Sequence, residues 1–448
     1  MGFKKGLLVA EKKNISGLVE MENQFKTPLK AWAILSCGWA FYLYEYILRV
    51  SPTVITNELM AQFNITAFTV GSLASFYYWS YVPLQVPCGV IVDKLGPRKV
   101  VTFSTILCVL GTVLFSQSSS LTIAYIGRFI VGAGSACAYL SCLKVASDWF
   151  RPTHFPLIVG ASMMMGTLGG MFGSKPFAIL VNSFGWRGAM LIAAAVGVII
   201  SLICWFVIKD KPDETKSYKP EEAGLLVGIK DIARKPQNWL IGLYGCMVYI
   251  PLAAFADLWG VPYFMQRYGL SNETASSGTI VVYLGIAIGC LICSSISKRL
   301  KSRKKVMSFS STATFLGFLA VLYIPELTYN EILLILFFTG VVSGVSFLYF
   351  AVAKEGNSIR HTATTVGFIN ALVMICPIIF QPLLGGLIDY SWTGSFNSDG
   401  TPAYTLQDYK FALSAVLIGL LISRILVFFI HDTYTKSQEI QGEEVRNA

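Results

Sequence analysis

The stretch Gly89-Val-Ile-Val-Asp93-Lys-Leu-Gly96-Pro-Arg98-Lys99-Val-Val101 decides the fold. It lies between two apolar runs, roughly residues 68–92 and 99–118. Each run is long enough to cross a bilayer, because about 20 apolar residues rising 1.5 Å each span the hydrocarbon core. The stretch between them is therefore predicted to be a tight turn at a membrane face.

The residues of this turn each have a physical reason to be there. Gly89 is expected to allow close helix contact, and Gly96 with the proline after it is expected to make the turn. Arg98 and Lys99 place the turn on the cytoplasmic side by the positive-inside rule. Asp93 lies at a helix end, where a carboxylate needs a cation or a helix N-terminus as its partner.

The composition of the whole chain agrees with a protein that crosses the membrane many times. Of its 448 residues 54% are hydrophobic and only 13% are charged, which is too little charge to cover the surface of a soluble protein. The net charge of +10 comes from lysines and arginines crowded into the segments predicted to be cytoplasmic. We therefore interpret the basic balance as membrane topology and expect no nucleic-acid partner.

Apolar runs between charges and turn formers indicate about 12 spans. The predicted fold is an all-α polytopic membrane protein whose transmembrane helices form two pseudo-symmetric halves of six. The predicted spans are roughly 29–50, 68–92, 99–118, 121–145, 157–182, 186–208, 237–264, 274–297, 306–324, 331–353, 364–389 and 410–431.

Five parts of the chain follow from these spans. An even number of spans with a basic N-terminus places both termini in the cytoplasm. The predicted parts are a cytoplasmic tail 1–28, an N-terminal bundle 29–208, a polar linker 209–236, a C-terminal bundle 237–432 and a cytoplasmic tail 433–448.

The two halves repeat weakly at an offset of about 206 residues, which places Arg98-Lys99-Val100 on Lys304-Lys305-Val306. The second copy of the turn, 298–305, keeps the basic residues but lacks the acidic residue and the glycine. We therefore expect the gating role of Asp93 in the first half alone.

The turn at 89–99 resembles the loop between transmembrane helices 2 and 3 of the major facilitator superfamily, with the pattern G-x-x-x-D-[RK]-x-G-[RP]-[RK]-[RK]. Arg128-Phe-Ile-Val-Gly132-Ala-Gly134 resembles the R-x-x-x-G-x-G signature of span 4 in that family. The pattern of spans 1 to 6 looks like a bacterial branch of the family and is distantly similar to the lysosomal dipeptide transporter. The resemblance implies rocker-switch alternating access about a central site lined by spans 1, 4, 7 and 10.

Residues at the cytoplasmic ends of the first-half helices are predicted to form a gate. Asp148-Trp-Phe-Arg151, after span 4, resembles another cytoplasmic turn of the superfamily. Asp148 is expected to accept hydrogen bonds from Arg98 or Lys99 and so to form a cluster with Asp93. The candidate gating residues are Gly89, Asp93, Gly96, Arg98, Lys99, Asp148 and Arg151.

Charged residues inside the spans are candidate site residues, because an unpaired charge there costs several kcal/mol. Glu45 and Arg49 are four residues apart and share a face of span 1, and Arg128 of span 4 is predicted to lie at the same level. We expect a Glu45–Arg128 pair that faces a central cavity with Arg49 nearby. The alternative is an ion pair that only locks the two helices.

Other polar and aromatic residues extend this candidate site. Tyr42 of span 1 and Tyr78 and Trp79 of span 2 are predicted to line a cavity, or else to anchor the helices at the interface. Asn370 of span 11 offers a neutral contact. Asp257, in the outer part of span 7, is a protonation candidate together with Glu45, or else an interfacial residue.

We hypothesise secondary transport of a small polar organic solute, such as an amino acid, a short peptide or an organic anion. Transport is expected to be proton-coupled or facilitative, and proton-driven drug or metabolite efflux is the alternative. The longest loops, about 25 residues, disfavour a membrane sensor, and no nucleophile–base or phosphate-loop pattern favours an enzyme. We expect no cofactor and no metal, a lipid bilayer as surroundings, a monomer, and the bacterial inner membrane as location.

Overall fold

The computed structural model describes residues 29–151, 154–210, 230–357, 362–398 and 400–434. Within these ranges the regular elements are helices, apart from one isolated bridge between Phe396 and Pro402. The predicted tail 1–28, most of the linker 209–236 and most of the tail 433–448 lie outside the described residues. The all-α prediction is confirmed.

The first half is a run of helices joined by short connections. Its elements are α2 (Leu29–Val50), η1 (Ser51–Val54), α3 (Thr56–Phe63), α4 (Ala67–Ser116), α5 (Leu121–Ser135), α6 (Ala138–Trp149), α7 (Phe155–Phe172) and α8 (Lys175–Val207).

The second half repeats this plan. Its elements are α10 (Pro236–Ile250), η4 (Pro251–Trp259, a π-helix), α11 (Gly260–Tyr268), α12 (Asn272–Ala275), α13 (Ser277–Leu300), α14 (Arg303–Tyr323), α15 (Tyr329–Val345), η5 (Ser346–Leu348), α16 (Tyr349–Glu355), α17 (Thr362–Ser391) and α18 (Leu406–Phe429).

These helices make twelve membrane crossings. Nine helical segments of the described residues are long and apolar enough to cross a membrane, and the bent pair Thr56–Phe63 and Ala67–Gln85 makes a tenth. One of the nine, Leu157–Val207, is 51 residues long and turns at Gly185, where φ is +70°, so it contains two crossings. The charged helix α2 completes the set. The predicted twelve-helix, two-half membrane protein is confirmed.

Gly96 makes the turn between the two crossings inside α4. Its φ of +77° lies in the left-handed region, where only glycine is unstrained. A Cβ at this position would also lie 2.5 Å from Oδ1 of Asp210. The close contact expected at Gly89 is absent, because a Cβ built there meets no described atom within 4 Å.

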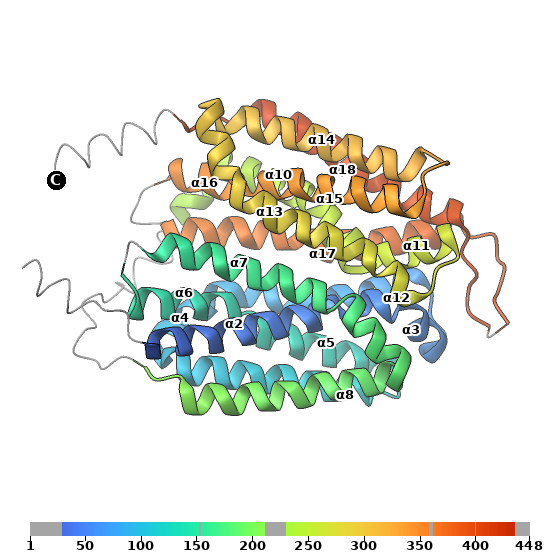
Figure 1. Cartoon of the computed structure of the whole chain (residues 1–448), viewed down its shortest axis with the longest axis horizontal. Helices are drawn as coiled ribbons and strands as arrows, with labels where there is room; N and C mark the ends of the chain where they lie inside the picture. Colours follow the sequence, from blue (N-terminus) through green and yellow to red (C-terminus); the bar gives the residue numbers. More distant parts are fainter. Residues whose placement is uncertain (1–28, 152–153, 211–229, 358–361, 399, 435–448) are drawn as a thin grey trace, which may run out of the picture.

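The two halves lie side by side along the long axis of the molecule (Figure 1), with α2–α8 in one layer and α10–α18 in the other. Helices α4 and α17 pack together across the boundary, and so do α7 and α13. Figure 1 shows α3, α11 and α12 at one end of the bundle and α6 and α16 at the other. These are called the α3 end and the α6 end below.

Candidate functional site

Two charged side chains of α2 are buried together in the middle of the molecule. Glu45 is 0% exposed and Arg49 is 4% exposed. Arg49 Nη2 donates to Glu45 Oε1 at 3.0 Å and to Oε2 at 3.3 Å. The Tyr77 hydroxyl of α4 joins both groups, since it donates to Glu45 Oε2 at 2.8 Å and accepts from Arg49 Nε at 3.2 Å. This hydrogen bonding compensates for the desolvation of the two charges.

Tyrosine rings surround the guanidinium group of Arg49. Its central carbon lies 4.4 Å from the ring centre of Tyr46, 4.9 Å from that of Tyr81, 5.4 Å from that of Tyr77 and 5.9 Å from that of Tyr78. The negative faces of aromatic rings attract a cation most strongly where water is excluded. These four rings, the tyrosine cage, stabilise the positive charge in addition to its hydrogen bonds, and Glu45 is the carboxylate that binds it.

Arg128 does not pair with Glu45, so that prediction is wrong. Its Nη1 donates to the carbonyl of Leu48 at 2.8 Å, and its Nη2 donates to those of Arg49 at 3.4 Å and Ala74 at 3.2 Å. Leu48 and Arg49 lie in the last turn of α2, where carbonyls have no partner within the helix. Arg128 therefore caps the end of α2. Glu45 pairs with Arg49 instead, because Arg49 lies one turn away on the same helix.

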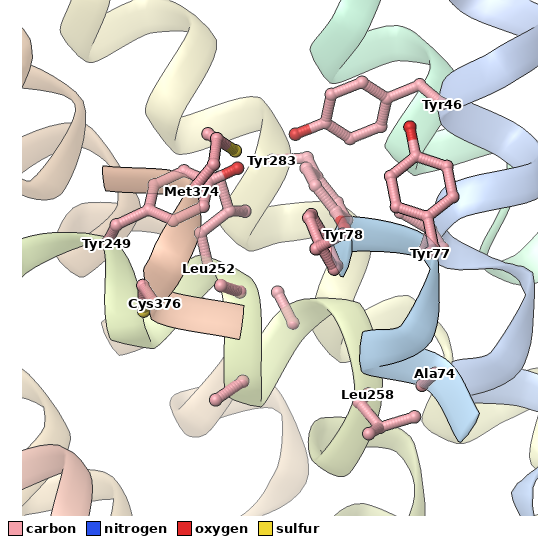
Figure 2. Packing of buried hydrophobic residues seen from close by; sticks show 14 of the residues in the cluster. Tyr46, Ala74, Tyr77, Tyr78, Tyr249, Leu252, Leu258, Tyr283, Met374 and Cys376 are labelled. Carbon is pink, nitrogen blue, oxygen red and sulfur yellow. The ribbon is translucent and has the colours of Figure 1, made fainter. Parts of the chain in front are cut away.

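Asp257 is a buried carboxylate of the second half and is 2% exposed. It lies in the π-helix η4, and two tyrosine hydroxyls donate to it. Tyr283 of α13 donates to Oδ1, and Tyr78 of α4 donates to Oδ2 at 3.4 Å. Tyr78 also contributes a ring to the cage around Arg49, so it lies between the charged groups of the two halves. Figure 2 shows these tyrosines gathered at the boundary between the halves.

The other predicted site residues separate into three environments. Tyr42 is buried next to the cage, with its ring centre 6.2 Å from that of Tyr46. Trp79 is 55% exposed and lies outside the buried cluster, so the structure does not support a role for it in the site. Asn370 of α17 donates from Nδ2 to Oε1 of Gln85 on α4 at 2.8 Å, which joins the two halves.

Tyr283 and Tyr249 belong to the site but were not predicted. Both are buried, and Figure 2 places them with Tyr46 and Tyr78. The ring of Tyr283 lies 6.4 Å from that of Tyr46 across the boundary between the halves. Tyr283 is the single aromatic residue between Gly278 and Leu300, a signal that the sequence does carry.

The buried charges of the site balance formally. Glu45 and Asp257 carry negative charge, and Arg49 and Arg128 carry positive charge when all four are ionised. Aromatic rings and hydroxyl groups fill the space around them. Because charges interact strongly where water is excluded, a ligand or proton that adds charge here must be compensated nearby. Within the described residues, no group of three metal-ligating side chains is placed to hold a metal ion.

The candidate gating residues meet at the α6 end in a different arrangement from the one expected. Lys144 Nζ of α6 lies 3.3 Å from Asp93 Oδ1 and 3.1 Å from Asp148 Oδ1. The two carboxylates therefore share one lysine of their own half. Arg151 ends the described stretch after α6 and is half-buried.

Arg98 binds the end of α8 and not Asp148, so that expected contact is wrong. Its Nε donates to the carbonyl of Trp205 at 2.9 Å, and its backbone N–H donates to Oδ1 of Asp210 at 3.0 Å. Lys99, next in the chain, is exposed. The physical reason is proximity, because the turn at Gly96 brings the start of the next crossing against the end of α8.

The second half also has charged contacts at the α6 end. They were not expected, because the turn at 298–305 lacks the acidic residue. Arg303 Nη2 lies 2.7 Å from Oε1 of Glu355 at the end of α16. The backbone N–H of Arg303 donates to Oδ1 of Asp432 at 3.0 Å. The acidic partners come from other parts of the half, so charged contacts at this end are present in both halves.

Comparison with known proteins extends this picture. A family model described as Major Facilitator Superfamily matches residues 34–381. The chain is 23% identical to a protein named probable sulfoacetate transporter SauU of Cupriavidus necator, over 93% of this chain and 97% of that protein. It is also 23% identical to the membrane sensor protein UhpC of Escherichia coli, over 81% of this chain and 87% of that protein.

A solved structure has the same fold. It is a bacterial homolog of the human lysosomal transporter Spinster in an inward-facing and unoccupied conformation. The TM-score is 0.73 at 16% sequence identity, and the match covers 91% of this chain and 97% of that one. At this identity the likeness shows the fold alone.

Proposed function

This chain belongs to the major facilitator superfamily, and we propose that it moves a small organic anion across the membrane together with a proton. Transport of a small organic solute is the general activity of its transporter relatives. The anion, the proton and the mechanism are the proposal. The observation that carries it is Arg49, a caged and buried guanidinium next to the boundary between the halves.

Arg49 is suited to bind a carboxylate or sulfonate. A guanidinium group presents parallel N–H donors that match the two oxygens of such an anion. In this structure Nη2 of Arg49 donates to both oxygens of Glu45, and Nε donates to the Tyr77 hydroxyl. An anionic substrate would displace Glu45 from Arg49, while the tyrosine rings keep the guanidinium in place. The name of SauU, a probable sulfoacetate transporter, supports an anion of this class.

Charge balance supports coupling to one proton. The four buried charges sum to zero, so binding a monoanion leaves one uncompensated negative charge in surroundings that disfavour it. A proton on Glu45 or Asp257 would restore neutrality. Glu45 is the carboxylate that loses its partner when the anion arrives, and Asp257 is bonded to tyrosine hydroxyls from both halves.

The halves would rock about the boundary that contains the site, which exposes it to each side in turn. The positive-inside rule supports a cytoplasmic α6 end, because Arg98, Lys144 and Arg303 lie there. We accordingly propose the bacterial inner membrane, with both chain ends on the cytoplasmic side, and a monomer as the transporting unit.

A membrane sensor is the second candidate, because UhpC carries that function in its name and covers most of this chain. The match covers 87% of UhpC, so the absence of long loops is no argument against a sensor. A sensor would bind an anion without net transport. Drug efflux has less support, since the buried charges form a compact, hydrogen-bonded set in place of a broad apolar surface.

The test is uptake into liposomes that contain the purified full-length protein. Radiolabelled hexuronate, a monoanion, and sulfoacetate, a dianion, are offered with and without an acidic exterior. Uptake that requires the pH gradient is expected. One proton per substrate predicts that an inside-negative potential opposes sulfoacetate uptake and leaves hexuronate uptake unchanged.

The matched variants are Arg49→Lys and Arg187→Lys. Arg187 binds Gln62 and the carbonyl of Ser118, away from the buried cluster, and is expected to tolerate the change. Arg49→Lys should raise the KM of both anions at least tenfold. Anion binding without uptake would favour the sensor, and an unchanged KM in Arg49→Lys would remove Arg49 from the proposed site.

A further inference from the structure

A carboxylate of the second half caps a helix of the first half at the α3 end. Asp389, at the end of α17, accepts hydrogen bonds from the first backbone N–H groups of α4. Oδ1 accepts from Ala67 N at 3.1 Å, and Oδ2 accepts from Phe68 N at 2.9 Å. One side chain thus binds two donors across the boundary between the halves.

The cap meets a local need of α4. The first N–H groups of a helix have no partner within it, and the usual partner is the side chain of the residue before the helix. That residue is Thr66, and its side chain forms no capping hydrogen bond. The negative charge of Asp389 also lies at the positive end of the helix dipole. The first half therefore depends on the second half for this cap.

Tyr404 holds the carboxylate in position. It lies in the connection before α18, and its hydroxyl donates to Oδ1 of Asp389 while it accepts from Ala67 N at 3.0 Å. The connection folds back on itself through the bridge between Phe396 and Pro402. Asp389 is thereby fixed on the side that faces α4.

The backbones of α4 and α17 approach each other closely next to the cap. A Cβ at Gly71 of α4 would lie 2.4 Å from the carbonyl oxygen of Gln381, and one at Gly385 of α17 would lie 2.3 Å from that of Ala67. Toward the α6 end the same two helices are less tightly packed, since a Cβ at Gly89 or Gly367 meets no described atom within 4 Å.

We propose that Asp389 is a latch that holds the halves together at the α3 end and opens once in each transport cycle. The halves cannot separate here without exposing two uncapped N–H groups and a carboxylate. The latch therefore sets the fraction of molecules open at this end. This inference rests on the alternating access proposed above, and Asp389 acts as a positioning residue that need not touch the substrate.

The test is hydrogen–deuterium exchange of the full-length protein in lipid nanodiscs, comparing wild type with Asp389→Ala. Exchange should become about two- to thirty-fold faster in the peptide that starts α4, the factor for loss of a helix cap. If the latch sets the equilibrium, peptides at the α6 end, around residues 86–95 and 365–371, should exchange more slowly in the same sample. Tyr404→Phe should give a smaller change of the same kind.

Asp408→Ala is the matched control, because Asp408 caps its own helix α18 through Thr405 within one half. It should speed exchange at α18 and change nothing at the α6 end. Faster exchange in α4 of Asp389→Ala without the opposite change at the α6 end would overturn the latch. No substrate is needed, so a failure to transport anions would reject the proposed function without affecting this result.

Discussion

Asp210 and Asp432 occupy equivalent positions in the two halves. Each lies two residues after the isoleucine, Ile208 or Ile430, that directly follows the last helix of its half. Asp210 Oδ1 accepts from the backbone N–H of Arg98, and Asp432 Oδ1 accepts from that of Arg303, both at 3.0 Å. Each carboxylate thus caps the helix that follows the basic turn of its own half.

This relationship ties the last crossing of each half to its third. The carboxylate lies at the positive end of a helix dipole, where negative charge is favourable. The half therefore closes on itself at the α6 end and is suited to move as one body. The weak sequence repeat has a clear structural counterpart here, although an offset of about 206 residues does not place Asp210 on Asp432.

The Asp432 cap predicts a pH-dependent contribution to stability. Burial opposes the charged form, but hydrogen bonds from Ser302 and from the N–H groups of Arg303, Tyr434 and Lys304 outweigh it and lower the pKa of Asp432. A lowered pKa in the folded state means that the stabilisation is full above about pH 4, the pKa of an unfolded aspartate, and is lost as the pH falls further.

Asp432→Asn removes the negative charge from the positive end of the helix dipole, so it should destabilise the protein by about 0.3–1 kcal/mol at pH 6. Thermal unfolding of detergent-solubilised wild type and variant, compared from pH 6 to pH 3, measures this. The gap between their Tm values should shrink below about pH 4. A gap that stays constant over this range would show that the charge of Asp432 contributes nothing.

The Glu45–Arg49 pair predicts that removing one of the two charges costs more stability than removing both. Arg49→Ala leaves a buried carboxylate without its cation, which costs about 3–5 kcal/mol. The double variant Glu45→Ala/Arg49→Ala should recover most of that stability, as measured by unfolding temperature, yet it should remain unable to bind anions. If the double variant is less stable than Arg49→Ala alone, the two side chains are not a coupled pair.

The crossings and the sharp turn could be predicted from the sequence because they depend on local chemistry. Apolar length determines a span, and Gly96 before a proline determines a turn, whatever the rest of the chain does. The Glu45–Arg49 spacing also indicated a shared helix face. Which arginine Glu45 binds was not predictable, since the choice depends on the carbonyls at the end of α2 that occupy Arg128.

The other differences between the sequence predictions and the structure arise from tertiary packing. Tyr77, Tyr78 and Trp79 are consecutive, so they point around the helix in different directions, and only the packed bundle reveals that the tryptophan points away. Tyr283 is the single aromatic residue of its apolar run, which marks the position but does not indicate what its hydroxyl binds. Its role follows from Asp257, which the π-helix brings within hydrogen-bonding reach.

Two glycines predict opposite outcomes for the same substitution. A Cβ at Gly132 of α5 would lie 1.9 Å from the carbonyl oxygen of Tyr77, so Gly132→Ala must push α5 from α4 and disturb the Tyr77–Glu45 contact. Gly89→Ala meets no described atom. Uptake should fall at least tenfold in the first variant and stay near wild type in the second. Loss of uptake in both, at equal protein levels, would contradict the geometry.

We predict that Asp93 acts through Lys144, the cation that it shares with Asp148. Lys144 binds Asp93 and Asp148, so Asp93→Asn leaves it with one carboxylate partner and loosens the link between α4 and α6. Because both groups are partly exposed, the effect on stability should stay below about 1 kcal/mol. Turnover of liposome uptake should fall several-fold with little change in KM. Asp148→Asn should have a smaller effect, because Asp148 lies on α6 with Lys144 and its loss keeps the Lys144–Asp93 link to α4. Lys144→Gln removes the shared cation, so adding Asp93→Asn to it should lower turnover no further. A further drop in that double variant would mean that Asp93 acts through a different partner.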